Sequence, residues 1–470
     1  MSDDAPAPAD EVANLFHAND YTYGAHDKRQ FRTQSKLSTF DTRVISMAAA
    51  SRRVFEDSLD FDAYFIGPRD LEKHSRLPYF MRIYGSVLPR MILPVLAVGA
   101  WATCITCISE FVYPLAVQNI LLTVLGFVVA LSLSFRSSTA YDRYSEARKA
   151  WCTLLIHCRN LSRCVWIHIS EREGEQGTDD LLQKVTVMNL ILAYAVALKH
   201  RLRFEPYAHY PDLAGLIPHL DTYAQAAHKE EHWRRKHRSV WKSIGQDLGL
   251  PFALSDPRKE IKRSDKPLGN LPMEIMAYLS AYVETIQNNG QIKTVIFGSQ
   301  IMSALAGMTE TAGNAERILN TPLPVGFNIL ISQVVLLYVY LLPFQLYSAL
   351  KWMTIPGTIA AAYIILGIDI IGDQLDNPFG NDVNDLPLDS YCAELSRDLD
   401  TLMSTPAVRY DEFLRQSGGV NRPLWPLSGG ILEDWREKGN DEIRSALRAK
   451  VLASNRPRYD HDRRRARQRS

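Results

Sequence analysis

The sequence predicts an all-α membrane protein with four transmembrane helices and a larger helical region outside the membrane. The apolar residues gather in two blocks, 91–135 and 319–371, and a long polar stretch separates them. The mean hydropathy of the whole chain is mildly negative, so the average conceals this arrangement. Two long apolar blocks joined by a polar region are typical of an integral membrane protein with a large aqueous domain.

Four segments are long and apolar enough to cross a bilayer as helices, which takes about 20 residues. They are Met91–Ser109, Pro114–Phe135, Leu319–Leu350 and Trp352–Ile371, with the last two crossings expected at about 324–345 and 353–371. Pro322 and Pro324 predict a broken start to the third segment. Asp369 lies near the end of the fourth, where a carboxylate is either interfacial or functional.

The charges beside these segments predict the orientation of the protein. The basic residues that flank the first two spans are Arg76, Arg82 and Arg90 before them and Arg136, Arg143, Arg148 and Lys149 after them. The connection 110–118 holds no Lys or Arg. Because basic residues accumulate on the cytosolic side, both termini and the middle region are expected in the cytosol, although Lys351 counts against this. The plasma membrane is the expected location, and an organelle membrane is the alternative.

Three regions are expected along the chain. Residues 1–75 form an amino-terminal cytosolic segment, partly disordered, because its acidic Pro/Ala-rich start is neither a signal nor a transit peptide. Residues 76–390 form the membrane domain, in which 136–318 is helical apart from an irregular insertion at 207–265. Within it, Trp151, Leu154, Leu155 and Cys158 make one apolar stripe. Residues 391–470 form a cytosolic tail.

Several functional classes have little support in the sequence. Lys plus Arg number 53 and Asp plus Glu 52, so the chain lacks the basic field of a nucleic-acid-binding protein. No phosphate-binding loop, dinucleotide fingerprint or serine nucleophile motif is present, so an enzyme is not expected. His228 and His232 match a zinc-peptidase spacing, H-x-x-E-H, which keeps a membrane-anchored zinc hydrolase as a remote alternative. The competing interpretation is a charged surface helix.

The second span carries a candidate pore surface. Phe127, Leu131 and Phe135 recur every four residues, which places them along one face of a helix. If several copies of the chain faced a shared axis, these residues would form three stacked apolar rings. Hydrophobic constrictions of that kind gate by excluding water. The alternative is a face that contacts lipid or packs against another helix.

Four segments together carry a resemblance to a known family. They are Leu133–Trp151, Asn320–Pro324, Tyr340–Phe344 and Gln374–Asp385, the last with the pattern Q-x-x-N-P-F-G-x-D-x-x-D. In this order and spacing the chain resembles the bestrophins over about residues 78–388. The resemblance implies a homopentameric channel with four transmembrane helices per subunit and a helical cytosolic domain, in which the five second helices line the pore.

The resemblance also implies the function and the pore residues. Phe127, Leu131 and Phe135 match the three hydrophobic neck positions of the family, and Ile296 is the nearest match to a second, cytosolic aperture. The implied activity is passive transport of chloride and other small monovalent anions across the lipid bilayer. Animal members have an aromatic residue where Leu131 stands, and a bacterial relative prefers cations. A cation-selective channel is therefore the nearest alternative.

No cofactor is required, but the resemblance implies a possible Ca²⁺ site after the fourth span. In animal members the backbone carbonyls that match Gln374 and Asn377 and the carboxylates that match Asp382 and Asp385 hold the ion. An amino-terminal carbonyl completes that site and is not placed in this sequence. Animal members have a continuous acidic run here, which this chain lacks, so a weaker site is expected. In the alternative, the two aspartates cap a helix or pair with nearby Arg.

Overall fold

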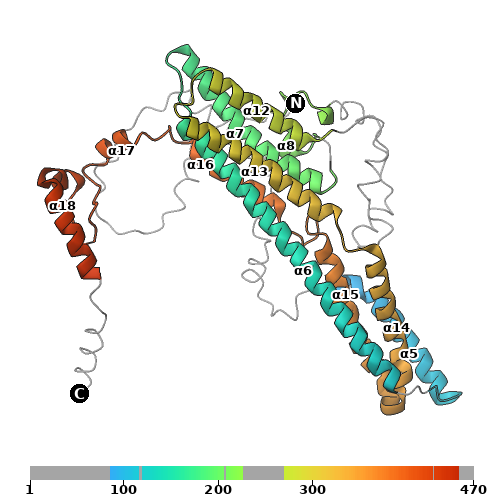
Figure 1. Cartoon of the computed structure of the whole chain (residues 1–470). Coiled ribbons are helices and arrows are strands. Elements are labelled where there is room, and N and C mark those ends of the chain that lie inside the picture. Colours follow the sequence, from blue (N-terminus) through green and yellow to red (C-terminus); the bar gives the residue numbers. More distant parts are fainter. Residues whose placement is uncertain (1–84, 116–118, 206–207, 226–268, 427, 455–470) are drawn as a thin grey trace, which may run out of the picture. The chain divides into compact units, whose positions relative to one another are not determined.

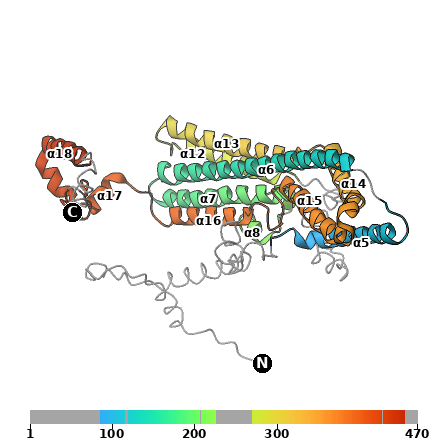
Figure 2. The ribbon, with the colours of Figure 1, turned by 90° about the horizontal axis from the view of Figure 1, so that it is seen from below.

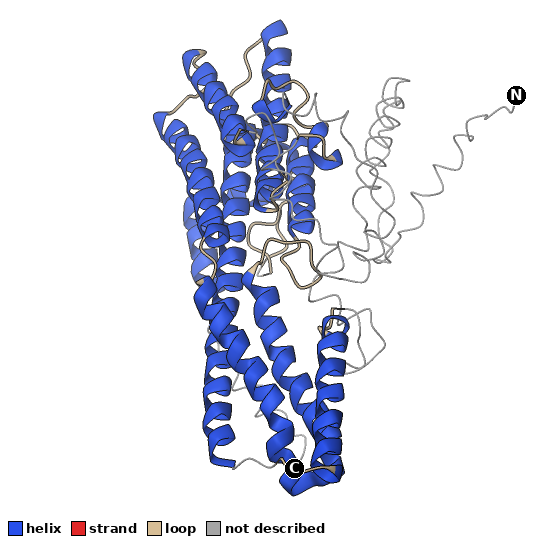
Figure 3. Ribbon diagram, turned by 90° about the vertical axis from the view of Figure 1, so that its right-hand side faces the viewer, coloured by secondary structure: helices blue, strands red, loops and turns tan. Residues whose placement is uncertain are grey.

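The structure is a computed structural model that describes residues 85–115, 119–205, 208–225, 269–426 and 428–454. In this part of the chain the fold is all-α, as predicted, and the only β-type pairing is an isolated bridge between Ile169 and Ile292 (Figure 3). The segment 1–75, most of the insertion 207–265 and the end of the tail lie outside the described residues. His228 and His232 lie outside them as well.

Three helices and the start of a fourth form an apolar bundle (Figure 1). They are α5 (Leu88–Phe111), α6 (Asn119–Arg163), α14 (Val325–Leu350) and α15 (Thr354–Asp376), with the short 3₁₀ turn η3 (Lys351–Met353) between α14 and α15. Val129 of α6 packs with Ile331 and Val335 of α14, and Val98 of α5 packs with Val339. Most of the remaining apolar side chains of these helices face outward, as lipid-facing side chains do.

Four helical segments of the described part are long and apolar enough to cross a membrane. Three of them overlap the four predicted spans, since α14 and α15 count together as Val325–Asp376. The other is α7 (Glu175–Leu202), but 67% of its apolar window is buried inside the protein, against 22–33% for the other three. An apolar helix that is covered by protein on most sides is typical of a domain core.

The structure corrects three predicted boundaries. Pro114 lies in the loop after α5, and the helix of the second span begins at Asn119. Leu319 belongs to α13 (Val295–Asn320), which ends before Pro322, because proline has no N–H to donate and its ring clashes with a preceding helical turn. The fourth span continues beyond Ile371 to Asp376, where charged side chains find partners on α6.

A second bundle is built around the later part of α6, which is one helix of 45 residues (Figure 2). It contains α7, α13, α12 (Leu271–Asn288) and α16 (Leu388–Met403). α6 contacts α13, α7 and α16, and α12 packs on α7. The predicted stripe of Trp151, Leu154, Leu155 and Cys158 is buried in its core. Because α6 belongs to both bundles, it connects them without a break.

Four further elements complete the described part. They are η2 (Cys164–His168), α8 (Pro211–Ala214), α17 (Tyr410–Gln416) and α18 (Leu432–Ser454), which bends at Gly439. α12 begins after Asn270, whose side chain accepts a hydrogen bond from the Met273 amide. The tail is expected from residue 391, but α16 begins at Leu388 and buries Cys392, Leu395 and Leu399. Packing of the second bundle therefore continues into the expected tail region.

Candidate functional site

The two faces of α6 have different surroundings. Val129, Leu133, Arg136 and Ala140 are buried, and their spacing places them on the face that packs against α14 and α15. The three predicted neck residues lie on the opposite face. Phe127 is 71% exposed, Leu131 47% and Phe135 59%. The fold therefore presents a row of large apolar side chains that a single chain leaves open.

This open face extends toward the start of α6. Ile120 and Val124 are exposed as well, and both fall on the side of the helix that carries Phe127 and Leu131. A contiguous apolar surface of this length is covered either by lipid or by further copies of the chain. α6 has no proline and no break over these residues, so the surface is continuous along the helix.

An ion-pair cluster around the buried Arg136 lies directly after Phe135, the last of the three predicted neck residues. Arg136 follows Phe135, and its side chain is only 3% exposed. The guanidinium donates to the carboxylates of Asp369 and Asp373 on α15. Gly372 lies between these two aspartates, and a Cβ there would already touch the Arg136 side chain. A buried guanidinium is tolerated only with such partners, so this cluster fastens α6 to α15 at the end of the apolar face.

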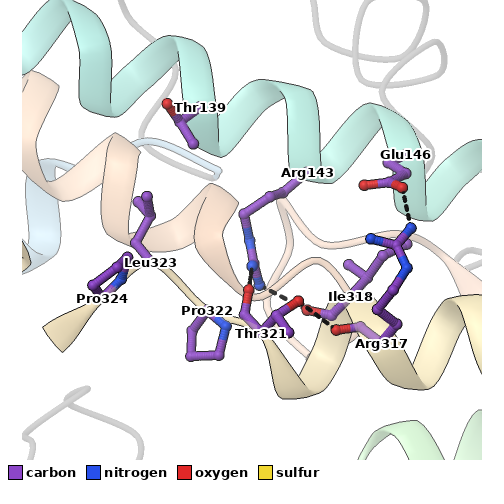
Figure 4. A pocket seen from close by; sticks show the side chains of 9 residues that line it. All are labelled: Thr139, Arg143, Glu146, Arg317, Ile318, Thr321, Pro322, Leu323 and Pro324. Carbon is purple, nitrogen blue, oxygen red and sulfur yellow. Dashed lines mark hydrogen bonds and ion pairs between the residues drawn. The ribbon is translucent and has the colours of Figure 1, made fainter.

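A second arginine on α6 joins the ends of two further helices (Figure 4). Arg143 donates to the carbonyls of Ile318 at 2.9 Å, of Asp376 at 3.0 Å and of Thr321. Its Nε atom lies 3.1 Å from the Asp376 carboxylate. A cation at the carboxyl end of a helix satisfies free carbonyls and complements the helix dipole. Arg143 thereby holds the last turns of α13 and α15 against α6.

A pocket of about 230 Å³ opens beside Arg143, where the two bundles meet (Figure 4). Its lining residues are Thr139, Arg143, Glu146, Arg317, Ile318, Thr321, Pro322, Leu323 and Pro324. Glu146 pairs with Arg317 across it. Each charged group of the lining thus has a partner within the described part of the chain. The pocket lies between α6, the end of α13 and the segment that leads into α14, and its charges connect these elements.

Of the predicted calcium residues, Gln374 lies in the last turn of α15, and Asn377, Asp382 and Asp385 lie in the loop that follows it. Asp382 accepts a hydrogen bond from Arg90 at 2.9 Å, and its amide donates to the Asp385 carboxylate at 2.7 Å. Asn384 donates to the Gln374 side chain at 2.9 Å and to the Gly85 carbonyl at 3.2 Å. The loop therefore touches the residues just before α5, where an amino-terminal carbonyl lies beside it.

The electrostatics of this loop bear on cation binding. Burial raises the pKa of Asp385 to about 7, and the charge of Asp382 acts in the same direction. A cation beside Asp385 would stabilise its ionised form. The described residues contain no group of three His, Cys, Asp or Glu side chains arranged to hold a metal. Asp382 and Asp385 are suitable oxygen donors, and a cation here would compete with Arg90 for Asp382.

Ile296 lies at the other end of the second bundle. It belongs to the first turn of α13 and is exposed. The next residue, Phe297, stacks on His168 with ring centroids 3.9 Å apart. Because the last turn of α13 meets Arg143 instead, α13 runs antiparallel to α6. Ile296 thus lies near the carboxyl end of α6, whereas the three predicted neck residues lie in its first half.

The sequence analysis missed the ion pairs between α6 and α15, although a signal was present. Asp369, Asp373 and Asp376 recur at i, i+4 and i+7, and Arg136 and Arg143 lie seven residues apart. Both spacings place the charges on one face of a helix. Acidic and basic stripes on two neighbouring helices match each other, but the sequence alone does not say that these helices are neighbours.

Comparison with known proteins identifies relatives over most of the chain. A family model described as bacterial/fungal bestrophin protein matches residues 68–401. A "voltage-dependent anion channel-forming protein" of Nostoc sp. is 31% identical over 330 residues, which is 70% of this chain and 92% of the relative. A protein of Synechocystis sp. with the same description is 29% identical over 326 residues, or 69% of this chain and 91% of the relative.

Solved structures also match about two thirds of the chain. The crystal structure of a variant of a bacterial bestrophin homolog from Klebsiella pneumoniae has a TM-score of 0.49 and a sequence identity of 22%. The match covers 67% of this chain and the whole of that chain, 100%. A second structure of that homolog has a TM-score of 0.48 at the same 22% identity, covering 67% of this chain and 99% of the other.

Proposed function

The chain belongs to the bacterial/fungal bestrophin family, and on that basis we propose that it is an ion channel for chloride and other small monovalent anions. Transport is passive, down the gradient of the ion. The two relatives compared above are described as anion channel-forming proteins, and the apolar helices match an integral membrane protein. This membership also removes the support for a zinc hydrolase built on His228 and His232.

The observation that carries the proposal is the open apolar face of α6. In a homopentamer, five copies of this face would surround one axis, and Phe127, Leu131 and Phe135 would form three rings. A narrow apolar neck excludes water and ions until its walls part, which makes it a gate. Packing of α6 against α14 and α15 supports this assignment, because it leaves the three side chains turned away from the rest of the subunit.

The position of the neck also suggests where the other parts of the channel lie. The second bundle lies in the cytosol with both termini, in agreement with the basic residues Arg136 and Arg143 just after the neck. Ile296, on an exposed turn at the far end of that bundle, forms the cytosolic aperture. The plasma membrane is the proposed location.

The loop after α15 is the proposed site of calcium regulation. The carbonyls of Gln374 and Asn377 and the carboxylates of Asp382 and Asp385 would hold the ion. Bound Ca²⁺ would supply a positive charge that balances the two carboxylates. The residues themselves connect this loop to the neck: Arg90 joins it to α5, and Arg136 joins α15 to α6 next to Phe135.

Currents of the purified protein in planar bilayers test the proposal. Under asymmetric chloride the reversal potential should follow the chloride gradient, whereas a cation-selective channel gives the opposite sign. Replacing Phe127, Leu131 and Phe135 together by Ala should make the neck wettable and raise open probability or conductance.

A matched control uses exposed leucines of α14. Leu330, Leu336 and Leu337 are about as exposed as the neck residues but lie on another helix. Their triple Ala variant should conduct like the native protein. The assignment of the neck is overturned if the α6 variant also keeps native conductance and open probability.

A further inference from the structure

The open face of α6 continues past the apolar bundle without interruption. The helix runs unbroken from Asn119 to Arg163, so its angular period carries over from one bundle to the next. Asp142 follows Phe135 by seven residues and Leu131 by eleven. At 3.6 residues per turn these steps are about two and about three full turns. Asp142 therefore lies on the same face of α6 as the three neck residues.

The surroundings of Asp142 differ from those of the neighbouring charges. Arg136 and Arg143 turn toward α15 and α13 and are paired there. Glu146 pairs with Arg317. Asp142 is exposed, and its side chain makes no hydrogen bond or ion pair with any residue that the structure describes. It is thus the first charged side chain on α6 after the neck that has no partner within the described part of the chain.

We propose that Asp142 lowers the anion-to-cation permeability ratio of this channel by opposing anions and favouring cations at the cytosolic end of the neck. The inference rests on the proposed pentameric pore, in which five copies of Asp142 would form a ring. At a rise of 1.5 Å per residue, this ring lies about 10 Å from the Phe135 ring. This distance is close to the Debye length of about 8 Å at physiological ionic strength, so salt weakens the field at Phe135 but the carboxylates act fully on an ion that approaches the neck from the cytosolic side. A confined passage strengthens their field.

A basic residue on the same face provides an internal comparison. Lys149 follows Leu131 by eighteen residues, about five full turns, and is exposed. It lies about 21 Å along the helix from Phe135, more than two Debye lengths. Its charge therefore acts weakly on ions at the neck, with a sign opposite to that of Asp142. The order of charges along the face, acidic first and basic farther away, is what gives Asp142 the larger effect.

The experiment measures reversal potentials of the full-length channel in bilayers under a NaCl gradient. Asp142→Asn should raise the anion-to-cation permeability ratio about threefold or more, since five screened charges are removed close to the neck. Asp142→Glu should keep the native ratio, because the charge remains. Lys149→Gln should change the ratio less and in the opposite direction. Glu284→Gln, at an exposed position of α12, serves as the control and should change nothing.

Salt dependence separates an electrostatic effect from a structural one. At 1 M salt the Debye length falls to about 3 Å, so the difference between Asp142→Asn and the native channel should nearly vanish. A difference that persists at high salt overturns the inference. An Asp142→Asn channel with the native ratio overturns it too. The triple Ala variant of Phe127, Leu131 and Phe135 then shows whether the role of Asp142 or the proposed pore is wrong. If that variant alters conductance, only the role of Asp142 is wrong; if it does not, the proposed pore is wrong as well.

Discussion

Arg90 at the start of α5 donates a hydrogen bond to Asp382 in the loop after α15, at a distance of 2.9 Å. Both side chains are partly exposed. The pair brings an arginine to one of the two carboxylates that calcium would need. Arg90 and a calcium ion therefore compete for the Asp382 carboxylate. Removal of the Arg90 side chain should increase the affinity of the loop for calcium.

This competition can be measured as current against free calcium. In the native channel the current should respond to calcium, and the double variant Asp382→Ala with Asp385→Ala should lose the response. Arg90→Gln should lower the half-effective calcium concentration by about 1.4- to fivefold, because an exposed ion pair contributes about 0.2–1 kcal/mol. Calcium-independent currents in the native channel would reduce the loop to a structural turn.

The buried Arg136 cluster should be important for stability. Arg136→Met leaves the Asp369 carboxylate without its partner at the end of the apolar bundle, and breaking a buried pair in this way costs about 3–5 kcal/mol. Thermal unfolding in detergent should show a clear loss. The double variant Arg136→Met with Asp369→Asn should recover part of it, since the less exposed carboxylate is then removed and Asp373, which is 62% exposed, is solvated by water.

An exposed pair provides the comparison for this prediction. Arg317 and Glu146 are both about half exposed, and Arg317→Gln should cost no more than about 1 kcal/mol. Equal losses in Arg136→Met and Arg317→Gln would contradict the importance of burial at Arg136.

Acid should weaken the second bundle through the carboxylates that surround Lys199. Its ammonium group contacts Asp389 at 2.6 Å and also pairs with Asp212. Burial alone would raise the pKa of both carboxyls. For Asp212, the hydrogen bond from His200 and the charge of Lys199 outweigh this effect, and for Asp389 the charges of Lys199 and Arg203 do. Both pKa values are thus lowered on folding.

The sign of the pH effect follows from this direction. A carboxyl with a lowered pKa stabilises the fold fully above its unfolded value of about 3.9 and loses that contribution as the pH falls through the folded value. The melting temperature should therefore decline more steeply below about pH 4 in the native protein than in Asp389→Asn. Asp179→Asn, at an exposed position of α7, should keep the native pH profile.

Trp151 should be a main contributor to the core of the second bundle. Its side chain is among the largest that are fully buried, and Trp151→Ala should cost about 3–5 kcal/mol because it leaves a cavity. Leu182→Ala, at an exposed position of α7, should stay within about 0.5 kcal/mol of the native protein. Unfolding of both variants in one detergent checks the difference, and similar stabilities would mean that the region around Trp151 repacks.

Several features of the candidate site were predictable because they depend on helix period alone. Phe127, Leu131 and Phe135 share a face in any helix that contains them, and the stripe through Trp151 and Leu154 had to be buried for its apolar area to leave water. The boundaries were less predictable. Pro114 reads as part of an apolar run, yet it lies in a loop, and Leu319 reads as the start of a span, yet it completes α13.

The sequence by itself determined that this is a helical membrane protein, that its spans lie in two blocks, and that one face of α6 is apolar over three turns. These properties follow from hydropathy and local period, which act between residues close together in the chain. Only the tertiary structure decided that Arg136 meets Asp369, that Arg90 meets Asp382, and that Asp142 has no partner among the residues that the structure describes. Each of these outcomes depends on which helices become neighbours, and that choice is made by burial of apolar area and pairing of charge over the whole fold.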